Sequence, residues 1–381
     1  MDSVRYGIVG IKGVGSQHVS LAQAHEKVEL TALVDVDAEF VTKQAEELGV
    51  RGFTDYRKML DAGVVDAVSI ATPHYLHSII GLACLNAGVH VFTEKPLANR
   101  VSEADAMIET AKAKDLKICV GHQYRTYRTP QTMKNLIETG KIGEIMRILW
   151  TWIEFRPESY YARDIWRGTW RHAGGGVLMN QTSHDLDLIC WLIGEAVQVS
   201  AMIGNQLHQI EVEDVVCANV LFANGACGSI QLTINQPRGH SIRQIAGDRG
   251  IIAIQDVQSL ASDRQDDILL GTYEDALPTL ASQTTGIAAQ PQISWQPVEP
   301  LNRPAGHEVL MDSFIEAILN GGESVVNGES ARPAVELINA IVLSAIQKKT
   351  VDLPLDREEY DQLFEALSSG KMRVPELKRK A

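Results

Sequence analysis

The chain has 381 residues, of which 45% are hydrophobic and 22% are charged, and its formal net charge is −13. A chain of this length can form two domains of ordinary size, each with its own hydrophobic core. The negative charge argues against nucleic acid or an anionic membrane as a partner, because both attract basic surfaces. No apolar run in the sequence is long enough to span a bilayer.

Cysteine usage and the first predicted strand bear on the cellular compartment. The chain has 5 cysteines and no C-x-x-C pair: Cys84, Cys119, Cys190, Cys217 and Cys227. Scattered cysteines of odd number in apolar runs predict reduced, buried thiols in a cytoplasmic protein. We expect no signal peptide, because the first predicted strand starts at about residue 4.

Residues 1–124 alternate predicted strands and helices. Apolar runs predict strands at residues 4–9, 28–34, 66–71, 89–93 and 117–120. Helical patterns lie between them, at residues 14–25, 38–48, 55–61, 75–87 and 102–114. This alternation predicts an α/β domain with a doubly wound parallel sheet. Short strands that are apolar almost throughout fit a sheet that is covered on both faces.

A glycine-rich turn follows the first predicted strand, and an acid follows the second. The residues concerned are Gly10, Lys12, Gly13, Val14 and Asp35. Glycines let the backbone approach a pyrophosphate, the following helix offers free N–H groups, and the acid binds the ribose hydroxyls. This layout predicts a dinucleotide site that takes NAD rather than NADP, because Asp35 would repel a 2′-phosphate. The alternative is an acid that only caps a loop.

One residue of this turn departs from the usual G-x-G-x-x-G pattern. Lys12 stands where the second glycine normally lies. Its side chain can contact the pyrophosphate or point to solvent. Gly13 and Gly15 supply the backbone freedom that the turn needs.

Two more turns lie at predicted strand ends. Residues 71–74 (Ala-Thr-Pro-His) precede a helix, and by themselves they predict a proline turn with His74 and His77 facing solvent. Residues 94–96 (Glu-Lys-Pro) follow the next strand. A lysine at that edge can donate to a substrate oxygen, or move a proton if its pKa is lowered. The alternative is an ordinary surface lysine.

After residue 126 the pattern changes to longer strands. A helix at about residues 130–139 precedes strands at 145–155, 197–203, 214–222, 226–234, 242–246 and 251–255. Residues 224–225 (Asn-Gly) and 248–250 (Asp-Arg-Gly) predict hairpin turns. The second domain, at residues 125–360, is therefore predicted to be a largely antiparallel sheet with helices on one face. We expect an irregular connection at 257–300, helices at 307–319 and 331–348, and a polar tail at 361–381.

A triple glycine at residues 174–176 precedes another candidate site. Asn180, His184 and Asp187 would share one face if they lay on one helix. A histidine there can act as a general base with a neighbour that fixes its tautomer, or can simply bond to the backbone. Just upstream, Trp166 and Arg167 combine an aromatic plane with a guanidinium group, which suits sugar binding but also occurs in packed loops.

In this order, the motifs resemble those of the glucose–fructose oxidoreductase/inositol dehydrogenase/MocA (Gfo/Idh/MocA) family. The resemblance covers nearly the whole chain. It includes the glycine turn at 10–15, the acid at 35, the turn at 71–74 with His77, and Glu-Lys-Pro-Leu at 94–97. It continues through the triple glycine with His184 and Asp187 to Gly-Glu-Ser-Ala-Arg at 328–332. No single motif is unique to the family, but the ordered set is specific.

The resemblance implies an N-terminal Rossmann domain and a C-terminal α/β domain with an open, mostly antiparallel sheet. It implies a nicotinamide-dependent oxidoreductase that acts on a secondary alcohol of a sugar, sugar derivative, glycoside or inositol. The family's catalytic pair falls on Lys95 and His184, and the motif proline, often cis in relatives, is Pro96. Homodimers or homotetramers that form through the sheet face are a further implication.

The remaining site residues are assigned with this resemblance in mind. The cofactor contacts would include Ala71, Thr72, Pro73, His74, His77, Glu94 and Lys95. The candidate substrate contacts are Tyr124, Arg125, Trp166, Arg167, Asn180 and His184. Many relatives carry Asp at position 180 and Asn at position 74. A neutral Asn180 can orient His184 and complete the catalytic set, but it stabilises the charged imidazole less well, which leaves the proton route open.

Two alternatives remain open at this point. Some relatives are glycosidases that use bound NAD for transient oxidation and elimination, and others are sensors without catalysis. Retention of both Lys95 and His184 argues against a sensor. We expect no metal site, because the 11 histidines show no ligand spacing with Cys, Asp or Glu that outweighs chance.

Overall fold

A computed structural model describes residues 3–239, 241–255, 267–284, 286–287 and 290–377. The chain forms two compact units. The first unit consists of Met1–Gln123, Arg171–Gly174 and Gly306–Val335. The second unit consists of Tyr124–Trp170, Gly175–Ala305 and Glu336–Ala381. Among the residues described, no helix has both the length and the hydrophobicity needed to cross a membrane.

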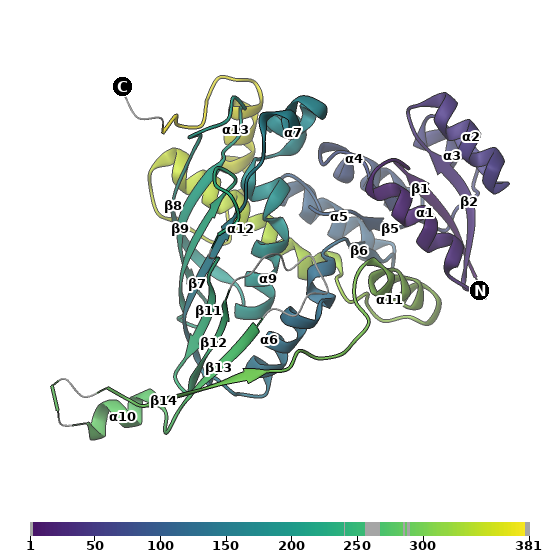
Figure 1. The fold of residues 1–381 in the computed structure, drawn as a ribbon. Helices are drawn as coiled ribbons and strands as arrows, with labels where there is room; N and C mark the ends of the chain where they lie inside the picture. Colours follow the sequence, from purple (N-terminus) through teal and green to yellow (C-terminus); the bar gives the residue numbers. More distant parts are fainter. Residues whose placement is uncertain (1–2, 240, 256–266, 285, 288–289, 378–381) are drawn as a thin grey trace. The chain divides into compact units, whose positions relative to one another are not determined.

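The first unit contains a six-stranded parallel sheet of order β3-β2-β1-β4-β5-β6 (Figure 1). Its strands are β1 (Val4–Val9), β2 (Val28–Val34), β3 (Arg51–Phe53), β4 (Ala67–Ile70), β5 (His90–Thr93) and β6 (Ile118–Val120). Its helices are α1 (Val14–Ala24), α2 (Ala38–Leu48), α3 (Tyr56–Asp61), α4 (Tyr75–Asn86), α5 (Val101–Ala113) and α11 (His307–Asn320). The predicted doubly wound parallel sheet is confirmed, and the edge strand β3 adds to it.

Local chemistry explains why these elements form where they do. All residues of β4 are buried, as a strand covered on both faces requires. The side chain of Asp37 accepts a hydrogen bond from the backbone of Phe40 and caps α2, while Asp55 caps α3 through Arg57. Because the strands are parallel, the turns after β1, β4 and β5 all lie at the carboxyl edge of the sheet.

The second unit contains a nine-stranded, mostly antiparallel sheet of order β14-β13-β12-β11-β7-β10-β9-β8-β15, in which β7 and β10 are parallel (Figure 1). Its strands are β7 (Ile145–Ile153), β8 (Ala196–Gly204), β9 (Val215–Phe222), β10 (Cys227–Thr233), β11 (Arg243–Gly247), β12 (Gly250–Gln255), β13 (Asp267–Tyr273), β14 (Ile293–Val298) and β15 (Val351–Asp352). The predicted hairpins at 224–225 and 248–250 join antiparallel neighbours, which confirms both turns.

Helices pack on one face of this sheet, and burial alternates along β9 and β10 accordingly. The helices and turns that lie wholly or partly in this unit are η1 (Gln123–Thr126), α6 (Arg128–Glu138), α7 (Glu158–Arg163), η2 (Ile165–Gly168), α8 (Trp170–Ala173), η3 (Val177–Gln181), α9 (Ser183–Ile193), α10 (Leu277–Gln283), α12 (Gly328–Gln347) and α13 (Arg357–Ser368). Asp185 on α9 accepts hydrogen bonds from Trp150 on β7 and Arg243 on β11, which ties the helix to the sheet.

The predicted irregular connection at 257–300 is wrong for much of its length. It contains β13, α10 and β14, while residues 256–266, 285 and 288–289 lie outside the described residues. The strand β14 has no buried residue, so its sequence lacks an apolar alternation, and pairing with β13 supplies its backbone hydrogen bonds instead. Helix α13 likewise occupies the start of the segment predicted to be a polar tail.

The prediction of buried cysteines is correct for three of the five positions. Cys84, Cys119 and Cys190 are buried, and all five cysteines are free. Cys217 and Cys227 are exposed, which corrects the prediction. Both lie on paired strands at positions that face away from the helices, and a short apolar strand does not by itself reveal which face is covered.

Candidate active site

The glycine turn between β1 and α1 has the backbone geometry that a phosphate-binding turn needs. Gly10 and Gly13 have φ angles of +83° and +57°, a region that glycine adopts without strain. A Cβ atom on Gly15 would lie 1.8 Å from the carbonyl oxygen of Gly10, so only glycine lets α1 approach the strand this closely. A Cβ atom on Gly13 would meet nothing within 4 Å, which leaves open space beside the turn. The turn therefore fits a dinucleotide pyrophosphate.

The acid at the end of β2 is held by the backbone around it. The Asp35 carboxylate accepts hydrogen bonds from the N–H of Ile11 at 3.2 Å and of Asp37 at 3.0 Å, and the residue is half-buried. Lys12 is exposed and forms an ion pair with Asp37 at 2.6 Å. The structure thus gives Lys12 a protein partner on the neighbouring loop.

The turn after β4 differs from the simple expectation of two solvent-facing histidines. His74 and His77 are both buried. The Nδ1 atom of His74 lies 2.9 Å from the carbonyl oxygen of Ala173. His77 places Nδ1 2.7 Å from the oxygen of Pro96 and Nε2 2.9 Å from that of Thr72, so it joins the turns after β4 and β5. Burial lowers the pKa of His77.

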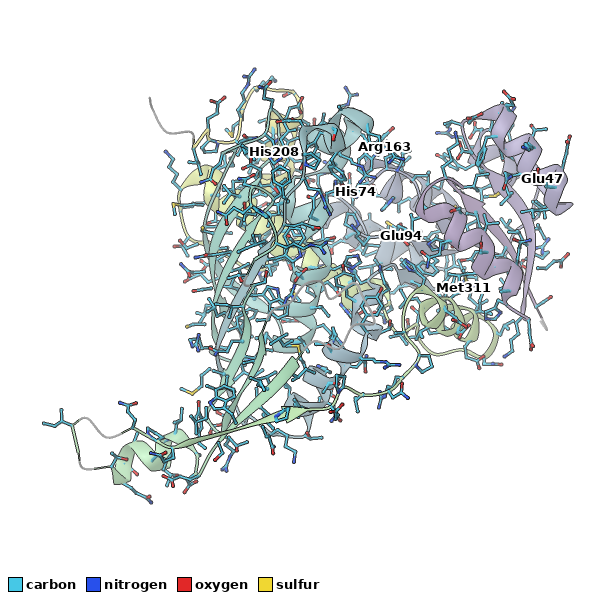
Figure 2. The ribbon with its side chains drawn as sticks, viewed as in Figure 1. Glu47, His74, Glu94, Arg163, His208 and Met311 are labelled. Carbon is cyan, nitrogen blue, oxygen red and sulfur yellow. The ribbon has the colours of Figure 1, made fainter. Side chains whose placement is uncertain are left out.

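Lys95 follows β5 on the turn that His77 holds. The Lys95–Pro96 peptide bond is cis, as the family resemblance implies, and the lysine is half-buried. Glu94, which precedes it, is buried, and its N–H donates to the carbonyl oxygen of Ile70 at 2.8 Å. Figure 2 labels Glu94 and His74 among the side chains of the first unit.

A buried carboxyl group supports the end of the triple glycine. Glu213 accepts hydrogen bonds from the N–H groups of Gly176 at 2.8 Å and Leu178 at 3.0 Å. A Cβ atom on Gly176 would lie 1.9 Å from the carbonyl oxygen of Glu213, so the two segments touch. Burial raises the pKa of Glu213 to about 7, although the two backbone hydrogen bonds act to lower it. The backbone at residues 176–178, shortly before Asn180 and His184, is therefore held by a carboxyl group whose pKa lies near neutral pH.

Asn180 and His184 do not lie on one α-helix, which corrects the prediction. Asn180 belongs to the π-helical turn η3, whereas His184 and Asp187 belong to α9. The His184 ring stacks on Tyr124, with ring centroids 4.1 Å apart and planes 11° apart. Asp187 forms a buried, bidentate ion pair with Arg125 at 2.6 and 2.7 Å. The stack orients the histidine ring, and the ion pair anchors its helix.

A polar cluster surrounds Asn180. Arg167 donates to the hydroxyl of Tyr160 at 2.9 Å and lies 3.5 Å from the amide oxygen of Asn180. The amide nitrogen of Asn180 lies 3.4 Å from the same hydroxyl. The Arg167 guanidinium also lies 4.7 Å from the ring centroid of Trp166 and pairs with Asp164 at 3.0 Å. The arrangement offers an aromatic face, hydroxyl and amide groups together, which suits a polyhydroxy ligand.

Sequence reasoning missed several residues that hold these positions. Tyr160 and Glu213 belong to no motif, and His18 and His307 are isolated histidines in apolar helices. Glu213 lies 37 residues from Gly176, and His18 and His307 lie 76 and 213 residues from their common partner Glu94, so no spacing rule could have identified them. Tyr160 is only 7 residues from Arg167, but nothing in the intervening sequence indicates the contact. The triple glycine at residues 174–176 is a local signal, because it indicates that another segment packs closely against this backbone.

Comparisons with known proteins match both parts of the chain. Residues 4–122 match the family profile described as an oxidoreductase family with an NAD-binding Rossmann fold. Residues 131–253 match the profile described as the GFO/IDH/MocA C-terminal domain.

Relatives of similar length support the same assignment. The chain is 26% identical to levoglucosan dehydrogenase of Pseudarthrobacter phenanthrenivorans, over 93% of this chain and 99% of that protein. It is 26% identical to myo-inositol 2-dehydrogenase of Thermotoga maritima, over 92% of this chain and 98% of that protein. Its fold is similar to that of the WlbA dehydrogenase from Bordetella pertussis in complex with NADH and UDP-GlcNAcA, with a TM-score of 0.78, 28% identity, and coverage of 93% and 100% of the two chains.

Proposed function

The chain belongs to the Gfo/Idh/MocA oxidoreductase family, and from this premise we propose that it oxidises a secondary alcohol of a sugar, sugar derivative, glycoside or inositol with NAD. Similar proteins include dehydrogenases of levoglucosan and myo-inositol, which supports this substrate class. The observation that carries the proposal is that the glycine turn after β1, the acid after β2 and both family catalytic positions are present together. Lys95 follows β5, and His184 lies on α9.

Bound at the glycine turn and Asp35, NAD would supply the acceptor for the hydride of the substrate C–H group. In our proposal His184 takes the hydroxyl proton and Lys95 donates to the oxygen to polarise it, and the reverse assignment is the competing arrangement. The stacked ring of Tyr124 fixes the plane of the His184 imidazole, so its nitrogen atoms keep one direction during proton transfer. Asn180 can orient the substrate or the histidine by hydrogen bonding, but it carries no charge.

Substrate contacts are proposed for the polar cluster around Asn180. Trp166 offers an apolar ring face and Arg167 a guanidinium group, the combination that sugars and their acids need. Tyr124 contributes its ring beside His184. We leave Arg125 out of the proposed contacts, because its guanidinium is buried against Asp187.

The role of Lys95 can be tested separately from cofactor binding. The substitution Lys95→Ala should lower kcat by about a hundredfold or more, because a positioned acid or base contributes on the order of 10²–10⁴ in rate. Affinity for NAD, measured by calorimetry, should change little. A variant that turns over at nearly the wild-type rate would contradict the assigned role.

NAD preference is proposed from Asp35. The substitution Asp35→Asn keeps an acceptor for the N–H of Ile11 and removes the charge that repels a 2′-phosphate. We expect kcat/KM with NADP to rise by about tenfold, which corresponds to about 1.4 kcal/mol. Glu47→Gln, on the exposed side of α2, removes one charge from the same unit and is the control. Equal use of NAD and NADP by the wild type would argue against this role.

The first experiment is NADH absorbance with NAD or NADP and a panel of free sugars, inositols, sugar acids and glycosides. A substrate-dependent rise with NAD would support the dehydrogenase, and the best substrate would narrow the class. Product formation without net NADH would instead favour a glycosidase that oxidises its substrate transiently. Binding of NAD without a reaction on any substrate would favour a sensor.

We further propose that the protein is a cytoplasmic homodimer or homotetramer that assembles through the sheet face opposite the helices. That face carries a groove that is lined in part by Leu221, and Met202 on the neighbouring strand is 71% exposed. The pair Met202→Lys and Leu221→Lys should shift the species seen by analytical ultracentrifugation toward the monomer. An unchanged sedimentation profile would place the interface elsewhere.

A further inference from the structure

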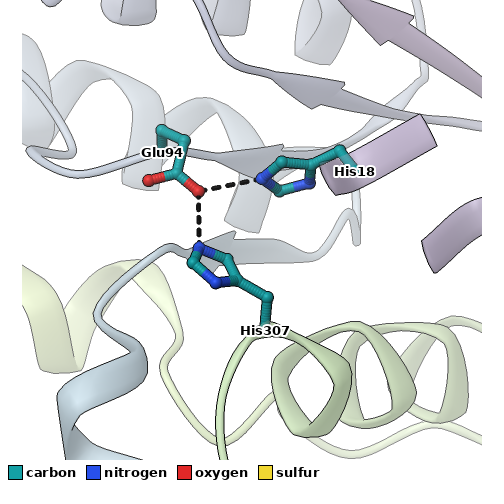
Figure 3. Close-up of side chains that lie close together, drawn as sticks. All are labelled: His18, Glu94 and His307. Carbon is teal, nitrogen blue, oxygen red and sulfur yellow. Dashed lines mark hydrogen bonds and ion pairs between the residues drawn. The ribbon is translucent and has the colours of Figure 1, made fainter. Parts of the chain in front are cut away.

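Three buried side chains from distant parts of the sequence, His18, Glu94 and His307, meet in the first unit, and Glu94 directly precedes Lys95 in the chain (Figure 3). The Oε1 atom of Glu94 lies 2.8 Å from Nε2 of His18 on α1. The same oxygen lies 2.9 Å from Nε2 of His307 at the start of α11. All three residues belong to the first unit, and each is less than one-tenth exposed.

A chain of hydrogen bonds runs from Tyr6 through Ser69 and His18 to Glu94, and its geometry indicates which atoms donate and which accept. Nδ1 of His18 lies 2.9 Å from Oγ of Ser69, which lies 2.8 Å from the hydroxyl of Tyr6. Because Nε2 of His18 faces a carboxylate, it must donate, and Nδ1 of the neutral ring then accepts from Ser69. Ser69 in turn accepts from Tyr6. With these roles, each of the polar atoms from Tyr6 to Glu94 has a hydrogen-bond partner.

Glu94 is held as a carboxylate by this arrangement. Burial alone would raise its pKa, but the hydrogen bonds from His18 and His307 hold the pKa well below its usual range. Gly121 provides the space, because a Cβ atom there would lie 2.9 Å from Oε2 of Glu94. The charge therefore has a fixed position, with donors on two sides and backbone on a third.

The same three groups have the chemistry of a metal site, but the distances favour hydrogen bonds. Zinc holds nitrogen and oxygen ligands at about 2.0–2.1 Å in a tetrahedron, which separates the ligand atoms by about 3.3 Å. The separations of 2.8 and 2.9 Å are those of N–H···O hydrogen bonds. Two N–H groups that converge on one carboxylate oxygen explain the cluster without an ion.

We propose that Glu94 is a positioning residue for Lys95 and that His18 and His307 are the clamps that fix it. The proposal rests on the catalytic role of Lys95 proposed above. The N–H of Glu94 is bonded to β4, and its carboxylate is bonded to α1 and α11, so the backbone that enters the cis peptide bond cannot rotate without breaking buried, charge-assisted hydrogen bonds. The carboxylate of Glu94 is thus a negative charge of fixed position on the residue that precedes Lys95.

His307 brings a distant segment into this arrangement. It lies 213 residues after Glu94 in the sequence, and α11 joins the first unit only after the chain has passed through the second unit. The catalytic lysine is thus held by a helix from outside the nucleotide-binding sequence motifs. His77, whose ring is bonded to the carbonyl oxygen of Pro96, is close enough to Lys95 for the lysine charge to contribute to lowering the pKa of the histidine.

The central test is Glu94→Gln, which keeps the shape of the side chain and removes its charge. We expect kcat to fall by about tenfold to a hundredfold, a part of the full contribution of a positioned acid or base. The Kd for NAD should stay within about threefold of the wild type. Asp66→Asn, at the opposite edge of the same sheet, removes a carboxylate that is paired with the exposed Arg5 and should leave kcat unchanged.

A second readout does not depend on the substrate. The pH at which Lys95 is half-acetylated in competitive labelling, followed by mass spectrometry, should fall in Glu94→Gln and stay constant in Asp66→Asn. If the wild type oxidises no substrate, the proposed function fails, but this labelling experiment still tests the positioning. Wild-type labelling and wild-type kcat in Glu94→Gln would overturn it.

A pair of His307 variants keeps the proposal testable if Glu94→Gln does not fold. His307→Gln retains an N–H donor in the place of Nε2 and should keep most of the activity, whereas His307→Phe removes the donor and should lower kcat. Equal activity of the two variants would argue against the clamp. One equivalent of tightly bound transition metal, found by elemental analysis and lost in His307→Phe, would overturn the hydrogen-bonded arrangement in favour of a metal site.

Discussion

Glu213 makes the stability of the second unit depend on pH. Its pKa is raised from 4.5 to about 7 by burial, so the folded state binds a proton more tightly than the unfolded chain does. The contribution of this group to stability is therefore complete below about pH 4.5 and is lost as the pH rises through about 7. A difference of about 2.5 pKa units corresponds to roughly 3 kcal/mol at about 1.4 kcal/mol per unit.

The substitution Glu213→Gln isolates this contribution. The amide can still accept hydrogen bonds from Gly176 and Leu178, and it cannot ionise. Urea unfolding, followed by circular dichroism between about pH 5 and about pH 8, should show that the wild type loses about 2–3 kcal/mol relative to the variant as the pH rises. Glu211→Gln is the matched control, because Glu211 lies two residues away and is exposed.

Parallel pH dependence of the wild type and Glu213→Gln would refute this reasoning. It would mean that Glu213 has nearly the same proton affinity in the folded and unfolded chains, and that its burial is relieved in solution. If instead Glu211→Gln alone changed how the free energy of unfolding depends on pH, the effect would come from Glu211 and not from Glu213. In either case the support of the triple glycine would no longer depend on a neutral carboxyl group.

Three further predictions address other parts of the structure. Gly15→Ala should destabilise the first unit by about 1–3 kcal/mol and weaken NAD binding in calorimetry, because its Cβ atom would lie 1.8 Å from a carbonyl oxygen, and unchanged binding would contradict the close approach. Asp187→Ala should cost about 3–5 kcal/mol in thermal unfolding, because it leaves the buried Arg125 guanidinium unpaired, and a shift no larger than that of an exposed acid would contradict this. Asn180→Asp should raise the pKa of His184 and move the acidic limb of the pH–rate profile to higher pH, and an unmoved limb would show that His184 is not the base.

Much of the first unit was predictable because its signals are local. The strands and helices through β6, apart from the short edge strand β3, follow from apolar runs separated by amphipathic ones, and the glycine turn with Asp35 follows from spacing. Local backbone geometry also suffices to explain why Gly10 and Gly15 are glycines. The catalytic roles proposed for Lys95 and His184 came from the family resemblance, because a single lysine or histidine in a sequence does not by itself indicate catalysis.

The errors have a common physical origin. His74 and His77 are polar residues in a first helical turn, and only the neighbouring carbonyl groups reveal why they are buried. Arg125 was expected to contact the substrate, but its guanidinium group is buried in an ion pair with Asp187. The strand β14 exposes most of its side chains, and its partner strand rather than its own apolar content determines its conformation.

The sequence by itself determined the parallel α/β sheet, the dinucleotide turn and the order of the motifs, because strand and helix periodicity and glycine spacing act over a few residues. Only the tertiary structure decided which polar groups meet in the interior. Glu94 meets His18 and His307, and Glu213 meets Gly176, across separations of up to 213 residues. A buried carboxylate needs hydrogen-bond donors, and the fold can supply them from any part of the chain. No sequence periodicity therefore predicts which residues these donors are.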